Sequence, residues 1–231
     1  MAASLLIDVI IPAFNEENSI ANVIADIDKQ LIREIVVVDN NSKDETAKRA
    51  KESGATVLNE SFQGYGAACL KGIEFINQKT SPPDIVVFID GDYSDFPEEM
   101  ARLVRPIVNG EADLVIGSRA LGHREKGSMT FQQVFGNQLA TSLIHLFYGM
   151  KFTDLGPFRA IRWEKLLALQ MRDRTYGWTV EMQLKAAKQH LKCVEVPVNY
   201  RRRIGVSKIS GTMKGTVLAG YKIITTIFKY L

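Results

Sequence analysis

Short apolar runs alternate with amphipathic stretches through the first half of the chain. The runs are rich in Val and Ile on both faces, as in strands buried in a parallel sheet, whereas the stretches between them repeat apolar residues every three or four positions, as in helices. This alternation predicts an α/β fold, with one mostly parallel, Rossmann-like sheet covered by helices on both faces. The expected strands cover residues 5–11 (closed by Pro12), 34–38, 56–58, 85–89 and 112–117. The expected helices cover 18–31 and 66–77. Two further helices are expected, one that Ser42 or Asp44 caps and that runs through Ala50, and one that Pro97 begins.

The second half of the chain is richer in helical patterns. We expect helices over 131–148, 163–171 and 178–189, then a strand over 193–198 and an amphipathic helix over 214–231. No repeat, low-complexity tract or linker divides the 231 residues, and this length suits one α/β domain. One face of the last helix is expected to carry Val217, Tyr221, Ile224, Phe228 and Leu231.

Polar side chains follow the expected strands at the points where they end. Because ligands of parallel sheets bind beyond the carboxyl ends of the strands, these side chains are expected to converge on one edge and form a site. They are Asn15 and Glu16 after the first strand, residues 39–42 after the second, Asp90 and Asp92 after the fourth, and Arg119 after the fifth.

The triplet Asp90-Gly91-Asp92 gives this edge its chemistry. Two carboxylates supply the oxygen ligands that magnesium and manganese prefer, and such ions keep further positions for water and phosphate oxygens. Gly91 is a residue that permits close approach of a ligand to the backbone. The triplet alone is equally typical of a solvated acidic turn, so its position after an apolar strand is what favours a metal site.

Composition and charge limit which binding partners and which cellular compartment suit the protein. A net charge of +3 argues against nucleic acid, but a basic cluster at 201–208 could hold phosphate opposite the acidic triplet. Cys69 and Cys193 have neither metal-ligand spacing nor a disulfide framework, and both are expected to be small buried side chains in a reducing, cytoplasmic protein. We expect no signal peptide, since the start lacks a basic segment and a long apolar run. His123, His145 and His190 show no ligand spacing.

Six motifs in order resemble those of family 2 glycosyltransferases. Four of them are general to the family, and two resemble its dolichyl- and polyprenyl-phosphate sugar synthase branch. The resemblance implies a GT-A fold and an inverting hexose transfer from a UDP- or GDP-sugar with Mg²⁺ or Mn²⁺. It also implies a nucleotide-sugar half (1–120), an acceptor half (121–211) and a C-terminal amphipathic helix (212–231). The general motifs are 9–16, 36–44, 90–92 and 117–119, and the branch motifs are 153–159 and 202–208.

The resemblance also implies roles for individual residues around the donor. The carboxylates face the sugar diphosphate, with Asp92 on the metal and Asp90 beside it at the sugar or ribose end, while guanidinium and ammonium groups balance the phosphates. The implied contacts are Pro12, Phe14 and Glu16 with base and ribose, Val38 and Asp39 with the base, Gly91 between the metal-binding carboxylates, Arg119 with the phosphates, and Arg202 and Lys208 on a loop that closes over the diphosphate.

Asp154 is the candidate general base for the acceptor hydroxyl. An acceptor phosphate is already anionic and needs no base, in which case Asp154 would position the acceptor or Arg159. Glu181 is a second candidate base, with an ion pair to Lys185 four residues later as the alternative. The turn at 64–66 could cradle phosphate, but its glycines are more simply explained by a loop that needs positive φ.

The acceptor is where the sequence departs from the branch. Gln133 and Asn137 stand about where the branch has Arg and Ser for the acceptor phosphate, and Pro157 stiffens the loop beside Asp154. A lipid-linked acceptor, polyprenyl or dolichyl phosphate, is the leading expectation. A different acceptor, a nucleotidyltransferase and a non-catalytic nucleotide-sugar-binding module remain alternatives. The 214–231 helix suits a membrane interface at the inner face, packing on the domain, or a homodimer contact.

Overall fold

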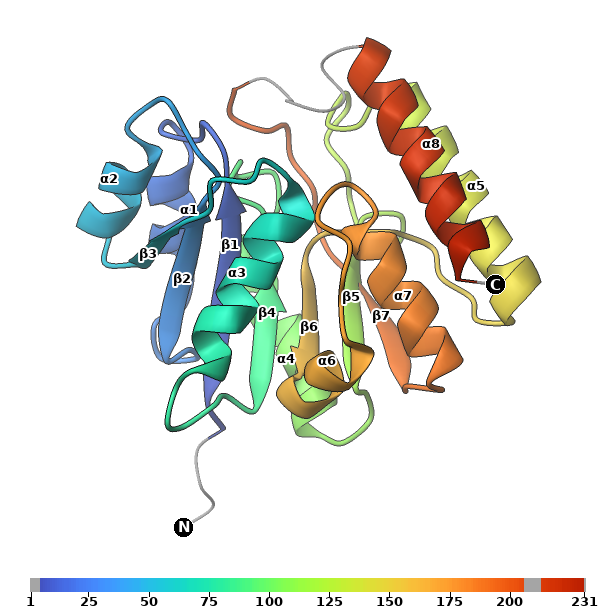
Figure 1. The fold of residues 1–231 in the computed structure, drawn as a ribbon, viewed down its shortest axis with the longest axis horizontal. Helices are drawn as coiled ribbons and strands as arrows, with labels where there is room; N and C mark the ends of the chain where they lie inside the picture. The colour runs from blue at the N-terminus through green and yellow to red at the C-terminus, as the bar shows by residue number, and fades with distance from the viewer. Residues whose placement is uncertain (1–4, 206–212, 231) are drawn as a thin grey trace.

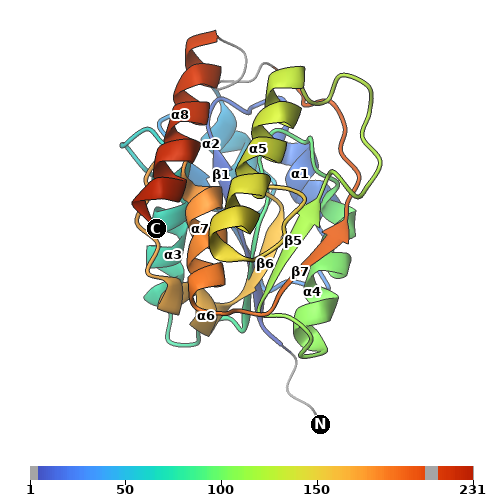
Figure 2. The same cartoon turned by 90° about the vertical axis from the view of Figure 1, so that its right-hand side faces the viewer.

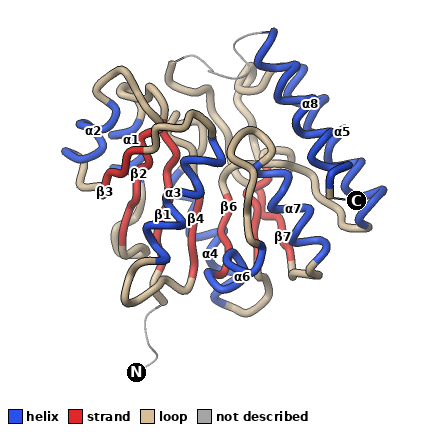
Figure 3. Tube along the Cα trace, viewed as in Figure 1, coloured by secondary structure: helices blue, strands red, loops and turns tan. Residues whose placement is uncertain are grey.

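A central sheet organises residues 5–205 and 213–230, which are the residues that the computed structural model describes (Figures 1 and 3). Within them the sheet has seven strands in the order β3-β2-β1-β4-β6-β5-β7, and all neighbours are parallel except those of β6. The expected α/β fold with a mostly parallel sheet is confirmed. The strands are β1 Ile7–Ala13, β2 Glu34–Asp39, β3 Thr56–Asn59, β4 Ile85–Phe88, β5 Leu114–Ser118, β6 Arg159–Arg162 and β7 Cys193–Pro197.

Helices cover both faces of the sheet, because side chains along each strand alternate between two cores. Ile10 and Val36 face one core, and Val9 and Val37 face the other. The first core lies under α3, α5, α6, α7 and α8, and the second lies under α1, α2 and α4. The helices are α1 Ile20–Asp26, α2 Thr46–Glu52, α3 Tyr65–Asn77, α4 Met100–Val108 (preceded by a 3₁₀ turn Pro97–Glu99), α5 Phe131–Tyr148, α6 Trp163–Leu169, α7 Trp178–Lys188 and α8 Met213–Lys229.

Strand β6 is an element that the sequence pattern did not predict. It runs antiparallel between β4 and β5, with Ala160 paired to Val87 and to Val115. The strand is four residues long and begins and ends with arginine, so it offers no apolar run to recognise. Arg159 is nonetheless fully buried, because its guanidinium donates to the carbonyls of Leu155, Gly156 and Thr179.

Two expected boundaries were wrong for identifiable reasons. Strand β1 continues through Pro12, which pairs with Val38 of β2. The Ile10 carbonyl accepts from the Ile89 amide, so the backbone groups of Ile10 point toward β4. The backbone of Pro12, two residues later, points the same way, but β4 has already ended there. The N–H that proline lacks is therefore not needed for a ladder hydrogen bond. Helix α1 ends at Asp26 rather than at residue 31, because Ile27 turns into an extended conformation.

Ser42 and Asp44 fasten two loops together at the carboxyl edge of the sheet. Ser42 Oγ accepts from the Asn15 amide at 2.9 Å, and Asp44 Oδ2 accepts from the Glu17 amide at 3.2 Å. Asp44 also accepts from the amide of Thr46, where α2 begins. Ser42 and Asp44 therefore tie the loop after β1 to the loop after β2, and neither is the N-cap residue of α2, which is Glu45.

The C-terminal helix α8 packs beside α5 and against α7 (Figure 2). Its Ile227 is buried and its carbonyl accepts from the Tyr148 hydroxyl at 2.9 Å, whereas Tyr221 and Phe228 are exposed. Tyr221, Ile224 and Phe228 do share a face, as expected, but that face points away from the domain, and the side chains of Val217 and Leu231 lie outside the described residues. No helix in the described part of the chain has the length and apolar character needed to cross a bilayer.

We predict that Asp8→Ala destabilises the fold by about 3 kcal/mol, because it removes the carboxylate that balances two mostly buried cations, of which Lys79 keeps a second carboxylate partner, Glu34. Asp8 is fully buried, and it pairs with Arg33 at 2.6 Å and Lys79 at 2.7 Å. Thermal unfolding followed by circular dichroism should show Tm lowered by about 10 °C. Glu45→Ala is the matched control, since its ion pair with Lys48 is exposed and should contribute almost nothing. A Tm of Asp8→Ala equal to that of the control would refute the buried-pair account.

Candidate functional site

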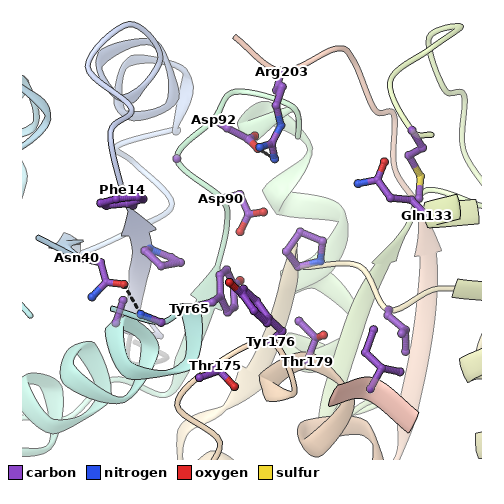
Figure 4. A pocket seen from close by; sticks show the side chains of 18 of the residues that line it. Phe14, Asn40, Tyr65, Asp90, Asp92, Gln133, Thr175, Tyr176, Thr179 and Arg203 are labelled. Carbon is purple, nitrogen blue, oxygen red and sulfur yellow. Dashed lines mark hydrogen bonds and ion pairs between the residues drawn. The ribbon is translucent and has the colours of Figure 1, made fainter. Parts of the chain in front are cut away.

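A cavity of about 590 Å³ opens beyond the carboxyl ends of the parallel strands (Figure 4). The loops after β1, β4 and β5 reach it from the sheet, and α5, α8 and the loop before α7 close it from the other side. The convergence expected from the strand-end residues is therefore observed. Of the residues singled out in the sequence as donor contacts, Pro12, Phe14, Glu16, Asp90, Gly91, Asp92 and Arg119 line this cavity.

The other residues singled out for the donor lie elsewhere. Val38 is fully buried in the core, and Asp39 is buried beside Asn40, which does line the cavity. Asp39 Oδ1 has no hydrogen-bond partner among the described residues. Arg202 donates to the Lys126 carbonyl at 2.6 Å and does not line the cavity, and Lys208 falls outside the described residues.

The carboxylates of Asp90 and Asp92 have different environments. Asp92 is buried, with Oδ1 accepting from the amide of Ser94 at 2.9 Å and Oδ2 paired with the guanidinium of Arg203. Asp90 faces the cavity, and its Oδ1 is buried without a hydrogen-bond partner in the described part of the chain. Burial, followed by the negative charge of Asp92, raises the pKa of Asp90 to about 7. Of the two carboxylates, Asp90 is the one with an oxygen that no described group hydrogen-bonds.

Arg119 is held by three hydrogen bonds to Asp154. Its backbone amide and Nε both reach Oδ2, at 2.7 and 2.8 Å, and its second guanidinium nitrogen reaches Oδ1 at 2.7 Å. Burial alone would raise the pKa of Asp154, but the charge and hydrogen bonds of Arg119 outweigh it and hold that pKa below its ordinary value. Arg119 lines the cavity and Asp154 does not. The carboxylate therefore fixes the direction of Arg119, and both of its oxygens are engaged.

The glycines at the start of α3 allow close packing against the loop before α7. They do not bind phosphate through free amides, and the turn does not require a positive φ. The amides of Gly66 and Ala67 donate to the carbonyls of Thr175 and Arg174, so they are not free for a ligand. A Cβ on Gly64 would lie 2.1 Å from the Arg174 carbonyl oxygen. Its φ of 162° is extended, so the loop expected at this turn does not need positive φ. The close approach places Tyr65 and Thr175 on the wall of the cavity.

The two amides at the expected acceptor positions line the cavity, but they already have structural partners. Asn137 Nδ2 donates to the Thr153 carbonyl at 3.0 Å, and Oδ1 accepts from the Leu155 amide at 2.8 Å. Gln133 Oε1 accepts from the Thr130 amide at the start of α5. Both residues hold the backbone around the expected acceptor side of the cavity, with Pro157 forming part of its wall.

Glu181 is not part of the cavity. Its side chain is buried and pairs with Lys185 at 2.7 Å, so the expected alternative to a general base, an ion pair with Lys185, is confirmed. It also accepts from the amides of Arg172 and Asp173 and from the Tyr230 hydroxyl. Burial acts to raise its pKa, but these partners lower it. Glu181 therefore organises the loop before α7 and the end of α8.

Sequence reasoning missed several residues of the cavity wall. Arg203 was passed over for its neighbour Arg202, because nothing in a run of three arginines shows which one turns inward. The residues around the start of α7 carry no motif, and they reach the site because β6 leads away from that edge and α6 and the loop after it bring the chain back to it. These missed residues are Tyr65, Thr175, Tyr176, Thr179, Tyr200 and Arg203.

Comparisons with known proteins agree with this geometry. The model of the family described as glycosyl transferase family 2 matches residues 8–168. An uncharacterized glycosyltransferase of Mycobacterium tuberculosis is 34% identical over 92% of this chain and 94% of its own. A dolichyl-phosphate N-acetylglucosaminyltransferase of Methanococcus voltae that is named for UDP-N-acetylglucosamine is 28% identical over 96% of this chain and 94% of its own.

Solved structures resemble the chain in fold. The glucosyl-3-phosphoglycerate synthase of Mycobacterium tuberculosis, solved with Mn²⁺, UDP-glucose and phosphoglyceric acid, has a TM-score of 0.76 at 24% identity, covering 99% of this chain and 80% of its own. This likeness confirms the expected GT-A fold. Together with the family match and the 34% identical relative, it identifies the chain as a glycosyltransferase that belongs to glycosyltransferase family 2.

Proposed function

We propose that this glycosyltransferase is inverting and metal-dependent, and that it moves a hexose from a UDP- or GDP-sugar to a polyprenyl or dolichyl phosphate. The observation that carries the donor half is the meeting of Asp90 and Asp92 with Arg119 and Arg203 in one cavity. Two carboxylates suit a divalent cation, and two guanidinium groups suit the phosphates that the cation binds.

Asp90 and Asp92 fit the requirements of Mg²⁺ or Mn²⁺. Both are oxygen donors two residues apart, and Asp90 Oδ1 has no competing partner among the described residues. Those residues contain no group of three or more His, Cys, Asp and Glu side chains that could enclose an ion. Such a site would leave coordination positions for diphosphate oxygens and water, as these ions require when they bind nucleotides. The bound ion would supply Lewis-acid stabilisation of the leaving diphosphate.

The chain's own residues support a single displacement. An acceptor oxygen forms a bond to the anomeric carbon as the bond to the diphosphate oxygen breaks, so the electron pair and the negative charge pass to the diphosphate. Arg119, fixed in direction by Asp154, stabilises that charge without having to reorganise. A phosphate acceptor arrives ionised, so Asp154 acts as a positioning residue for Arg119 and no general base is needed.

An exposed apolar surface beside the cavity supports a lipid acceptor. We name it the α5–α8 apolar surface, and its side chains are unusually exposed for large apolar residues, Phe131 at 80% and Leu146 at 72%. The same helices line the cavity through Gly136 of α5 and Ile223 of α8. A lipid tail could therefore follow the surface while its phosphate enters the cavity. The surface consists of Phe131, Phe135, Leu139, Leu146 and Phe147 of α5 and Tyr221, Ile224 and Phe228 of α8.

The same surface supports peripheral attachment of the enzyme to a membrane. Apolar side chains on two adjacent helices suit the boundary between headgroups and acyl chains. The relative from Methanococcus voltae is named for a dolichyl-phosphate acceptor, which is consistent with such an attachment. We place the enzyme on the cytoplasmic side, at the inner face of the membrane.

The reaction itself is tested by incubating the protein with Mn²⁺, a panel of nucleotide sugars and polyprenyl phosphate, and by measuring nucleoside diphosphate release. We expect release with a UDP- or GDP-hexose only, and its loss in Asp92→Ala or on chelation of the metal. Transfer to 3-phosphoglycerate but not to the lipid would refute the lipid acceptor. Release of pyrophosphate would indicate a nucleotidyltransferase, and binding without turnover would indicate a non-catalytic module.

Asp154→Asn should weaken donor binding by about tenfold and lower kcat less, because Arg119 loses the charge that directs it. Isothermal titration with a UDP-sugar and the pH profile of kcat measure the two effects. A general base would give the opposite pattern, with kcat lower by about 10² to 10⁴ and donor affinity unchanged. Asp113→Asn is the matched control, since its carboxylate lies 3.7 Å from Arg162 at the other end of β5.

The double variant Phe131→Ser/Phe135→Ser should lose at least about tenfold in affinity for vesicles containing polyprenyl phosphate, because partial burial of two Phe side chains contributes more than 1.4 kcal/mol. Vesicle co-sedimentation measures the affinity. Both side chains are exposed, so the fold should be unaffected. Val108→Ser, a change of an exposed residue on α4 across the sheet, should leave sedimentation unchanged. If the double variant and Val108→Ser sediment equally with the vesicles, the α5–α8 apolar surface is excluded as the attachment site.

A further inference from the structure

The segment 200–204 lies along the segment 92–95 that carries the second metal-binding carboxylate. The amide of Arg201 donates to the Ser94 carbonyl at 2.9 Å, and the amide of Ile204 donates to the Asp92 carbonyl at 3.0 Å. An isolated β-bridge joins Tyr200 to Asp95 at the start of the same contact. Backbone hydrogen bonds at Arg201 and Ile204 thus hold the two residues between them, and of these Arg203 contacts Asp92.

The two arginines before Arg203 serve as anchors for this segment. The guanidinium of Arg201 stacks on the Tyr93 ring with its central carbon 3.4 Å from the ring centroid, and it donates to the Tyr93 carbonyl at 2.7 Å. The guanidinium of Arg202 donates to the Lys126 carbonyl. Neither group reaches the cavity, so Arg203 is the arginine of the run that does.

Arg203 occupies the place on Asp92 that a metal ion would need. Its guanidinium pairs with Oδ2, as Figure 4 shows, while Oδ1 accepts from both the amide and the hydroxyl of Ser94. The Asp92 side chain is 4% exposed and that of Arg203 is 29% exposed, so water screens this pair less than a surface pair. A divalent cation that approaches Asp92 Oδ2 would meet the positive charge of this guanidinium, so the two cations compete for the same oxygen.

We infer that Arg203 is a stand-in cation that keeps the metal position on Asp92 closed until the metal arrives with a nucleoside diphosphate. This inference rests on the proposed metal-dependent donor binding. A metal ion alone would displace the guanidinium and leave two positive groups side by side, with one of them unpaired. A metal-bound diphosphate instead offers phosphate oxygens, which match the planar fork of arginine, so the guanidinium exchanges one anionic partner for another.

The exchange makes metal and nucleotide binding cooperative. Each ligand binds better when the other is present, and the coupling must be equal in both directions. The enzyme therefore takes up Mn²⁺ mainly as the complex with its nucleotide. While Arg203 is paired with Asp92, it also balances the charge of this buried carboxylate, which would be costly to leave unpaired.

The test is a Mn²⁺ titration followed by the electron paramagnetic resonance signal of the free ion, with and without UDP or GDP. Wild type should bind Mn²⁺ weakly alone and about tenfold more tightly with the nucleotide that it recognises. Arg203→Ala and Arg203→Gln should bind Mn²⁺ alone about tenfold more tightly than wild type, and should show a smaller effect of nucleotide. Arg203→Lys keeps a positive charge and should stay close to wild type.

Arg105→Ala is the control, because it removes an exposed positive charge of α4 that neither touches Asp92 nor anchors the segment 200–204, and it should titrate as wild type does. Circular dichroism melting establishes that each variant is folded. If folded Arg203→Ala and Arg203→Gln bind Mn²⁺ alone no more tightly than wild type, while all three bind Mn²⁺ with nucleotide, the stand-in role is refuted and the donor proposal survives. If wild type binds no Mn²⁺ even with nucleotide, the metal-dependent donor proposal fails, and the inference fails with it.

Discussion

The common direction of β1, β2, β4 and β5 is the constraint on which the rest of the structure depends. Parallel strands end at one edge, so the residues that follow them meet there although they are far apart in the chain. Asp90 and Asp92 come from one of these ends and Arg119 from another. The sheet thereby brings carboxylates and a guanidinium into the same cavity, and no single loop could do so.

Several charges gather at one buried edge, and two of the carboxylates are balanced pairwise, with Arg119 on Asp154 and Arg203 on Asp92. Asp90 Oδ1, in contrast, has no hydrogen-bond partner among the described residues. The two pairs differ in what they can do. The first is closed by three hydrogen bonds and fixes a positive charge that faces the cavity. The second lies on the proposed metal ligand itself. The proposed binding of a metal-bound donor would therefore open it, whereas the first would stay closed as a positioning contact.

The proposed acceptor side of the cavity is built by the chain on both sides of β6. Because that strand runs antiparallel, it begins at the functional edge, so the loop before it lies there. Helix α6 and the loop after it then bring the start of α7 back to the same edge, where Arg159 joins the two segments through backbone carbonyls. Helices α5 and α8 then close the cavity while keeping a row of apolar side chains exposed. The acceptor side thus combines a firmly held wall with an exposed apolar surface, an arrangement suited to an acceptor that has a polar head and an apolar tail.

Periodicity and strand-end chemistry in the sequence determined the α/β class, most of the elements and the donor half of the site. These features are local, so Asp90, Asp92 and Arg119 could be identified from the residues beside them. The tertiary structure alone decided three further points: the antiparallel insertion of β6, the inward turn of Arg203 in place of Arg202, and the pairing of Asp154 with Arg119. Each depends on which distant residue supplies a hydrogen bond or a counter-charge. Periodicity and spacing describe only residues that are near in the sequence, so they cannot identify that distant partner.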